Sequence, residues 1–420
     1  MKARGKVARA LMTFAFLLST LQFLIVERGD EMLRVIPIVV FCAAAIVGFI
    51  CAPSSRRQAI AASCFHPQFI LIFGIAGVLP TVSSIYSSQR ATLYGALMVI
   101  VLLSARSLVT ATGLDGILQS LYHSLAMAIP LVVALSLPSF LGALGGKRYS
   151  PFEFHPNILA MFCAVLAPLH LWIGGQGKLW RMVHWFGALF AAAVLFATGS
   201  RGSLISLVVA LVCASLLKWM AEGMRITQTR AISALLIAGA LVAGSLGALR
   251  GSENADKAQN FVTQKLDLNS RDRGVSSGMS GRTKIWDSFV PLMLSTLSAF
   301  GNGYRTTSES FNRAIDNGYL TTIYELGVVP TLVILIVYGR NLWYTAWYYL
   351  RGDGGDTALR TYFCLVGCAL LNGAVTRVLF GYGDPVSIFT LCFVAAVRDD
   401  LKELRTIPVA PRAELQEVAV

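Results

Sequence analysis

Long apolar runs separated by short polar segments dominate this chain. A helix needs about 20 mainly apolar residues to cross the hydrocarbon core of a bilayer. By this measure the pattern predicts about twelve membrane-spanning helices. They lie near residues 11–26, 35–52, 69–86, 91–103, 117–137, 156–173, 182–198, 203–220, 231–249, 319–338, 361–379 and 386–397. The expected fold class is therefore all-α, a polytopic membrane protein.

Composition agrees with the hydrophobic pattern. Of 420 residues, 55% are hydrophobic and only 14% are charged, which excludes an ordinary soluble domain. The first apolar run, "FLLSTLQFLIVERGD", lacks a small-residue cleavage site, so we expect a retained span and not a signal peptide. The 8 cysteines lie in spans or near their ends, so no disulfide framework is expected.

Charge distribution gives the expected orientation. An even number of spans puts both termini on one side of the membrane. If that side is the cytoplasm, the cytoplasmic segments hold most of the Lys and Arg residues near span ends, as the positive-inside rule requires. The net charge of +13 then reflects topology, and no nucleic-acid partner is indicated.

Four regions follow from this arrangement. Residues 1–150 hold spans one to five, and residues 151–340 form a core with a large outer loop at 250–317, between spans nine and ten. Residues 341–397 hold the last two spans, and 398–420 form a cytoplasmic tail. Within the loop, "TKIWDSFVPLMLSTLSAF" predicts an amphipathic helix that lies on the membrane surface or caps a cavity. Loops of this length in compact proteins are usually functional.

Polar residues recur near the predicted outer face. They lie in four motifs: Arg201 in "TGSRGSL", Arg282 in "GRTKIW", His155 and Asn157 in "FHPNILA", and Asp316 and Asn317 in "DNGYL". Arginines stay protonated, and a pair of them can hold a diphosphate leaving group. A carboxylate opposite them can take a proton from an attacking hydroxyl. This chemistry suits transfer of a sugar from a lipid diphosphate to a hydroxyl.

Together, the four motifs resemble the bacterial O-antigen ligase and Wzy-type polymerase superfamily, which includes exopolysaccharide polymerases. The resemblance covers about residues 151–338. It implies a metal-independent glycosyltransferase without a cofactor, in the bacterial inner (cytoplasmic) membrane. Its site would face the periplasm, and its substrates would be an undecaprenyl-diphosphate-linked glycan donor and a sugar acceptor. A flippase and a chain-length regulator are further expected partners.

The resemblance also implies roles for single residues. Arg201 and Arg282 would bind the donor diphosphate, and Asp316 would activate the acceptor hydroxyl. The residues expected to bind the rest of the substrates are His155, Asn157, Trp286, Asn317 and Tyr319. One departure stands out, because ligases of this family typically carry a histidine at the position of Asp316. The aspartate favours a polymerase over a ligase.

Ordinary structural roles are compatible with the same residues, and two further functions are compatible with the same chain. Arg201 at a helix end also suits a side chain that reaches the membrane surface. Arg282 suits a solvated loop, Asp316 suits a helix N-cap, and His155 suits a membrane boundary. The further functions are an O-antigen ligase that transfers glycan to lipid A-core, and a transporter or flippase of lipid-linked oligosaccharide.

Overall fold

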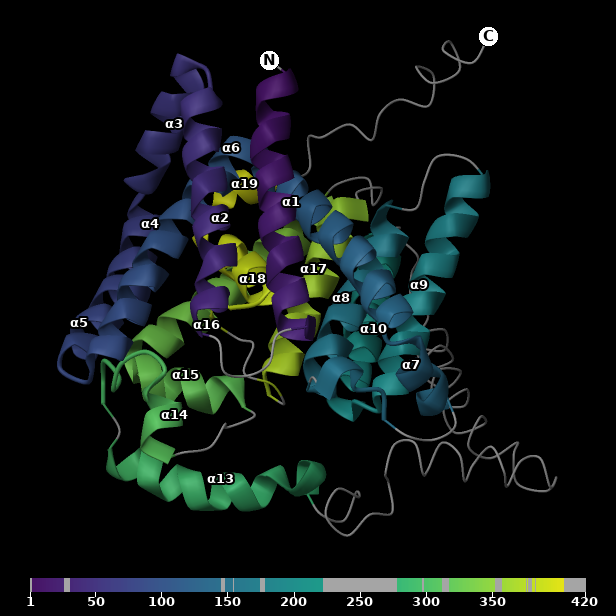
Figure 1. Cartoon of the computed structure of the whole chain (residues 1–420). Coiled ribbons are helices and arrows are strands. Elements are labelled where there is room, and N and C mark those ends of the chain that lie inside the picture. Colours follow the sequence, from purple (N-terminus) through teal and green to yellow (C-terminus); the bar gives the residue numbers. More distant parts are fainter. Residues whose placement is uncertain are drawn as a thin grey trace.

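The structure is a computed structural model, and its regular elements are helices throughout the residues it describes (Figure 1). Those residues are 2–25, 31–144, 148–153, 155–173, 178–221, 278–296, 298–311, 317–351, 357–374, 376, 380–381 and 383–403. Within these ranges, 5 helices are long and apolar enough to cross a membrane, and four shorter apolar helices accompany them. The expected class, an all-α polytopic membrane protein, is confirmed. The predicted span at 231–249 lies outside the described residues.

The first third of the chain forms the predicted first five spans. The helices are α1 (Lys2–Ile25), α2 (Glu31–Cys51), α3 (Ser54–Cys64), α4 (Pro67–Ile72), the π-helix η1 (Phe73–Val78), α5 (Leu79–Ile85) and α6 (Gln89–Leu135). α6 contains two predicted spans, because Gly113 breaks it with a φ of 73° and a ψ of 163°. The polar contacts on either side of this glycine place both halves of α6 beside the same end of the bundle: Arg106 contacts Asp400, and Gln119 contacts Arg9.

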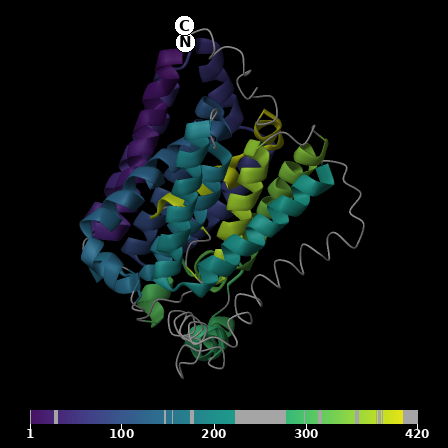
Figure 2. The ribbon, with the colours of Figure 1, turned by 90° about the vertical axis from the view of Figure 1, so that its right-hand side faces the viewer.

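The remaining helices complete the bundle and close one end of it. They are α7 (Leu137–Leu144), the 3-10 turn η2 (Pro151–Glu153), α8 (Pro156–Ile173), α9 (Lys178–Thr198), α10 (Arg201–Ala221), α13 (Gly278–Ser295), α14 (Thr306–Phe311), α15 (Gly318–Leu326), α16 (Val328–Arg351), α17 (Thr357–Gly373), α18 (Pro385–Ala395) and α19 (Arg398–Glu403). α13 lies across one end of the bundle, which we call the α13 end (Figures 1 and 2). α1 begins at the opposite end, near α19, which we call the α19 end (Figure 1).

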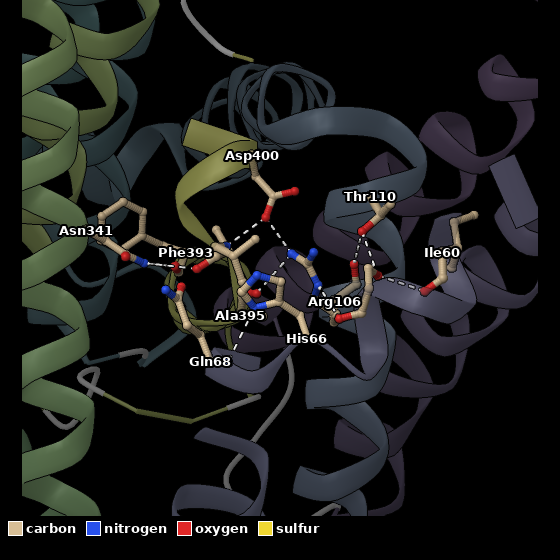
Figure 3. A network of polar contacts seen from close by, with 12 residues as sticks. Ile60, His66, Gln68, Arg106, Thr110, Asn341, Phe393, Ala395 and Asp400 are labelled. Atoms are coloured by element: carbon tan, nitrogen blue, oxygen red, sulfur yellow. Dashed lines mark hydrogen bonds and ion pairs between the residues drawn. The ribbon is translucent and has the colours of Figure 1, made fainter. Parts of the chain in front are cut away.

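A buried ion pair joins α6 to α19 at the α19 end of the bundle. The guanidinium of Arg106, 3% exposed, lies 2.5 Å from the carboxylate of Asp400, 13% exposed (Figure 3). Arg106 also donates to the carbonyl oxygens of Ser63 and Ala395, at 3.2 and 3.3 Å. The amide of Asn341 donates to the carbonyl of Phe393 at 2.7 Å. The last carbonyls of a helix lack the amide donor four residues ahead. At the end of α18, the amide of Ala396 donates to the carbonyl of Phe393 at 3.3 Å, and Arg106 and Asn341 supply further donors.

We expect Arg106→Met and Asp400→Leu each to destabilise the protein. The double variant should be destabilised by less than the sum of the two single effects. Each single change leaves a buried charge without its partner. The double change removes both charges, so the coupling energy should be about 1 to 3 kcal/mol. Thermal unfolding of the four purified proteins in detergent measures it. Strict additivity would mean that the pair contributes nothing to stability.

The segment before α14 pairs with the break between α15 and α16. Residue 302 donates its amide N–H to the carbonyl of Tyr324 at 3.1 Å, and residue 303 donates its amide N–H to the carbonyl of Glu325 at 3.0 Å. In the other direction, the amide N–H groups of Val328 and Val329 donate to the backbone carbonyls of residues 298 and 299, at 3.3 and 3.1 Å. These four bonds form a short ladder of backbone pairing at 298–303 and 324–329. The single predicted span at 319–338 is therefore two helices, α15 and α16, joined at Gly327.

This ladder is anchored to the first half of the chain through Tyr304. Its side chain is buried, and its hydroxyl donates to the carbonyl of Ala76 at 3.0 Å. Ala76 lies in η1, where π-helical geometry replaces the α-helical pattern of backbone bonds. The neighbouring Arg305 stacks over the ring of Tyr94 in α6, with its guanidinium carbon 4.4 Å from the ring centroid. The π-helix η1 and helix α6 therefore fix the position of the segment that follows α13.

Candidate functional site

Arg201 is the first residue of α10. The preceding α9 ends at Thr198, and Gly199 adopts a φ of 64°, a left-handed conformation that glycine tolerates without strain. The hydroxyl of Thr198 accepts the amide N–H of Ser200 at 3.2 Å. The chain thus reverses within two residues. The sequence pattern predicted the helix from Ser203, two residues too late, because the glycine turn is tighter than the apolar pattern indicates.

An arginine in this position is electrostatically unusual. The N-terminus of a helix carries a partial positive charge, so a cation there is disfavoured unless an anion joins it. The N-terminus of a helix and a guanidinium together form a site suited to a phosphate. Arg201 is half-buried in the structure. The start of α10 therefore combines three features of a phosphate site: a helix N-terminus, a positively charged side chain and a glycine-rich turn.

A second arginine, Arg148, supports the same turn. Its Nε donates to the carbonyl of Thr198 at 2.9 Å, and its Nη2 lies 3.3 Å from the side-chain oxygen of Asn157. Asn157, a predicted substrate residue in α8, is 7% exposed and so is part of this buried contact. The amide of Tyr149 adds a bond to the carbonyl of Ala197 at 2.8 Å.

Sequence reasoning missed the role of Arg148. In the sequence the residue is only one of several positive charges in an outer segment. Its distance along the chain from "TGSRGSL" gives no sign of the 2.9 Å contact with Thr198. The one available signal is its position in the outer segment that also holds the predicted residues His155 and Asn157.

The end of α17 brings α10 and α15 together. The amide of Asn372 donates to the hydroxyl of Ser203, in the first turn of α10, at 3.1 Å. Two positions earlier, the carbonyl of Leu370 accepts the hydroxyl of Tyr319 at 2.7 Å. Both contacts lie in the last turn of α17, so the start of α10 and the start of α15 flank the same helix end. The predicted residues Arg201 and Tyr319 are thereby on one side of the bundle.

The start of α15 corrects one alternative. Asn317 is its N-cap, with the side-chain oxygen accepting the amide N–H of Leu320 at 3.0 Å. The N-cap role considered for Asp316 is therefore wrong, because the next residue fills it. Asp316 itself lies outside the described residues. Its sequence position puts it directly before a capped helix start at the α13 end.

α13 confirms the helix expected for the outer loop. Trp286, Phe289 and Met293, spaced along one side of the helix, pack against α15. The ring of Phe289 lies 5.9 Å from that of Tyr324, centroid to centroid. Arg282 is one turn before Trp286 in the same helix. The helix that carries Arg282 is therefore attached to the helix that begins after Asp316 and Asn317.

His155 lies at the start of α8. Its carbonyl accepts the amide N–H of Ile158 at 3.0 Å, and Pro156 takes the first helical position, where its missing N–H costs nothing. The side chain of His155 is half-buried. Only one helical position separates it from Asn157, which contacts Arg148. Among the described residues, no group of three His, Cys, Asp or Glu is placed to hold a metal ion.

A comparison with protein families identifies the segment that contains most of these residues. Residues 186–336 match the model of the O-antigen ligase family. This range includes Arg201, Arg282, Trp286, Asp316, Asn317 and Tyr319, whereas Arg148, His155 and Asn157 precede it. A search of curated proteins finds no match. Over residues 186–336 the chain is therefore similar to the O-antigen ligase family, which supports the resemblance of its motifs to the O-antigen ligase and Wzy-type polymerase superfamily.

Proposed function

We propose that the protein is a polysaccharide polymerase of the bacterial inner membrane. It transfers a glycan from an undecaprenyl-diphosphate donor to a hydroxyl of a lipid-linked acceptor sugar at the periplasmic face. The product is a lengthened exopolysaccharide or O-antigen chain, and the leaving group is undecaprenyl diphosphate. In this mechanism Arg201 and Arg282 bind the donor diphosphate, and Asp316 accepts the proton of the attacking hydroxyl.

The observation that carries this proposal is the position of Arg201. It begins a membrane helix at the end of the bundle that α13 covers, in a turn to which Arg148 donates. A lipid diphosphate has its headgroup at the membrane boundary, where this turn would meet it. Stabilisation of the charge that develops on a leaving group is often the largest single contribution to catalysis. α13, held to α15 through Trp286, is suited to cover the bound headgroups.

The choice between polymerase and ligase rests on Asp316. An aspartate replaces the histidine typical of the ligases, and this favours the polymerase. The distinguishing measurement is the product in a strain that lacks this chain. Loss of a polymerase leaves single repeat units, whereas loss of a ligase leaves long chains on the lipid carrier. Long carrier-bound chains in the deletion strain would refute the polymerase and support transfer to lipid A-core.

A transporter or flippase of lipid-linked oligosaccharide is the alternative from another class. Alternating access is often built from repeated halves, and the sequence contains no related halves. Purified protein in vesicles should lengthen lipid-linked repeat units without an ion gradient. Movement of the substrate across the vesicle membrane without any change in its chain length would support the transporter.

We expect Arg148→Lys to lower the rate of chain lengthening by roughly 10- to 100-fold, since small displacements in an active site have effects of that size. Lysine has a single ammonium group and cannot reproduce the geometry that joins Thr198 to Asn157. Gel analysis of polymer formed by purified protein measures the rate. Arg57→Lys, in α3 at a distance from this turn in sequence and fold, is the charge-matched control. Equal rates for both variants and the parent would remove Arg148 from the site.

A further inference from the structure

The last turns of α16 reach the membrane boundary at the α19 end of the bundle. α16 has 24 residues, so at about 1.5 Å per residue it is about 36 Å long, against about 30 Å for the hydrocarbon core. Its first residue, Val328, is bonded to the segment at 298–303 near the α13 end. α19 packs against α16, and Leu401 is the only apolar residue among its six. The end of α16 beside α19 therefore lies in the headgroup region.

One side of α16 stays exposed in the structure. Val329, Leu332, Ile336 and Trp343 are 38, 53, 67 and 64% exposed, respectively. Their spacing of three, four and seven positions puts them on a single side of the helix. A contiguous exposed apolar side on a membrane-spanning helix is suited to contact with lipid acyl chains. This side leads to Trp347, one turn after Trp343.

Four aromatic rings cover the end of this side, and we call them the α16 aromatic surface. Trp343 stacks on Trp347, with ring centroids 6.1 Å apart and an interplanar angle of 27°. Tyr344 lies beside Tyr348, with ring centroids 6.3 Å apart. Residues three apart on a helix are neighbours, with Cβ atoms about 5 to 6 Å apart, so Tyr344 and Trp347 connect the two pairs. Trp and Tyr are enriched at the boundary between membrane and water.

Two arginines place guanidinium groups on neighbouring rings of the α16 aromatic surface. The guanidinium carbon of Arg351 lies 3.8 Å from the centroid of the Trp347 ring. That of Arg398, from α19, lies 5.3 Å from the centroid of the Tyr344 ring, and its Nε donates to the hydroxyl of Tyr348 at 3.0 Å. Both arginines are exposed, so a ligand can reach them. The ring contacts restrict both side chains before any ligand binds, which lowers the entropy cost of binding.

This arrangement fits an anionic phospholipid. Guanidinium groups bind phosphate through paired N–H donors. The acyl chains attached to such a phosphate would lie along the exposed apolar side that ends at Trp343. A zwitterionic lipid carries a cation near its phosphate, which two arginines disfavour, and an acidic protein segment has no acyl chain for the apolar side. The distribution of Lys and Arg predicts that the α19 end is cytoplasmic, and the cytoplasmic leaflet holds anionic lipids.

We propose that Arg351 and Arg398 bind the phosphate of one anionic phospholipid, whose acyl chains contact Trp343 and the exposed side of α16. Both arginines lie outside the matched segment at 186–336. The site is at the opposite end of the bundle from Arg201, so it does not depend on the proposed glycan transfer. The bound lipid joins the end of α16 to α19.

Native mass spectrometry of the purified full chain in detergent tests this site. The parent protein should bind one phosphatidylglycerol more tightly than it binds phosphatidylcholine. The double variant Arg351→Gln, Arg398→Gln should bind phosphatidylglycerol roughly 10- to 30-fold more weakly, the size expected for two arginines near an anionic lipid. Its binding of phosphatidylcholine should not change. Because both side chains are exposed, the double variant should fold as the parent does.

Two further variants separate the site from net charge. The charge-matched control is the double variant Arg56→Gln, Arg57→Gln, on exposed arginines of α3 at the same end of the bundle (Figure 1). It should bind phosphatidylglycerol as the parent does. Trp347→Leu keeps every charge but removes the ring under Arg351, and it should weaken binding about two- to fivefold. Equal weakening in the two arginine double variants would mean that only net charge matters, and would overturn the site.

Melting temperatures test the identity of the ligand. Phosphatidylglycerol should raise the melting temperature of the parent and of the α3 control more than phosphatidylcholine does. The double variant at Arg351 and Arg398 should lose this difference. Inorganic phosphate at the same concentration and ionic strength should give no such rise. A rise with inorganic phosphate equal to that with phosphatidylglycerol would assign the arginines to a free anion. Equal rises with the two lipids would make the surface an ordinary membrane boundary, and either result would overturn the proposal.

Discussion

Arg201→Ala should lower polymer formation by at least about 100-fold, the usual effect of removing one preorganised electrostatic group from an active site. The substitution leaves the glycine turn and the first amides of α10 in place but removes the fixed positive charge. Arg201→Lys should retain part of the activity, because lysine keeps the charge and loses the two-pronged geometry of the guanidinium. The measurement is the ladder of chain lengths in a deletion strain that carries each variant.

The control for this experiment lies on the same helix. Lys218 is in the last turn of α10, at the opposite end from Arg201. Lys218→Ala changes the net charge equally and should leave the ladder normal. Protein levels in the membrane fraction must match for all variants. A normal ladder with Arg201→Ala at parental protein levels would rule out the proposed role of this arginine.

Gly327→Ala should sharply lower the melting temperature and the yield of folded protein. Gly327 has a φ of 95°, and a Cβ there would lie 2.3 Å from the backbone nitrogen of Gly301 and 2.5 Å from the carbonyl oxygen of Ala299. Backbone atoms cannot rotate away, so the whole ladder at 298–303 would have to move. The strain and the displaced packing together should cost roughly 3 to 5 kcal/mol. That is a large part of the stability of an ordinary protein.

Thermal unfolding and size-exclusion profiles of detergent extracts measure this loss. Gly339→Ala is the matched control, because Gly339 lies within α16 and a Cβ there would have no heavy atom within 4 Å. Alanine in a helix interior should raise stability by about 1 kcal/mol relative to glycine. Equal melting temperatures for the two variants would contradict the tight backbone contact at Gly327.

The apolar pattern predicted the helices well where local sequence decides their ends. Pro156 begins α8, as expected for proline at a first helical position, and Gly113 separates the two spans of α6. Gly327 shows the limit of this approach. "YELGVVP" continues an apolar run, so the pattern predicted one span. The break arises from backbone contact with Gly301, a residue of the distant loop.

The sequence likewise identified one part of the candidate site and missed another. Motifs identified Arg201 and the helix that carries Arg282, because glycine and arginine within an apolar chain are conspicuous. Arg148 was not identified, since its contact with Thr198 joins residues 50 positions apart.

The contact between Tyr304 and Ala76 sets an order for biogenesis. The two residues are 228 positions apart, and the helix that contains Ala76 emerges from the ribosome long before Tyr304 does. At about 5 to 20 residues per second, translation of the intervening chain takes roughly 10 to 45 seconds. During that interval the π-helical turn at Ala76 has no phenol to bond its carbonyl. The segment at Tyr304 is therefore added to helices of the first third of the chain that were synthesised well before it.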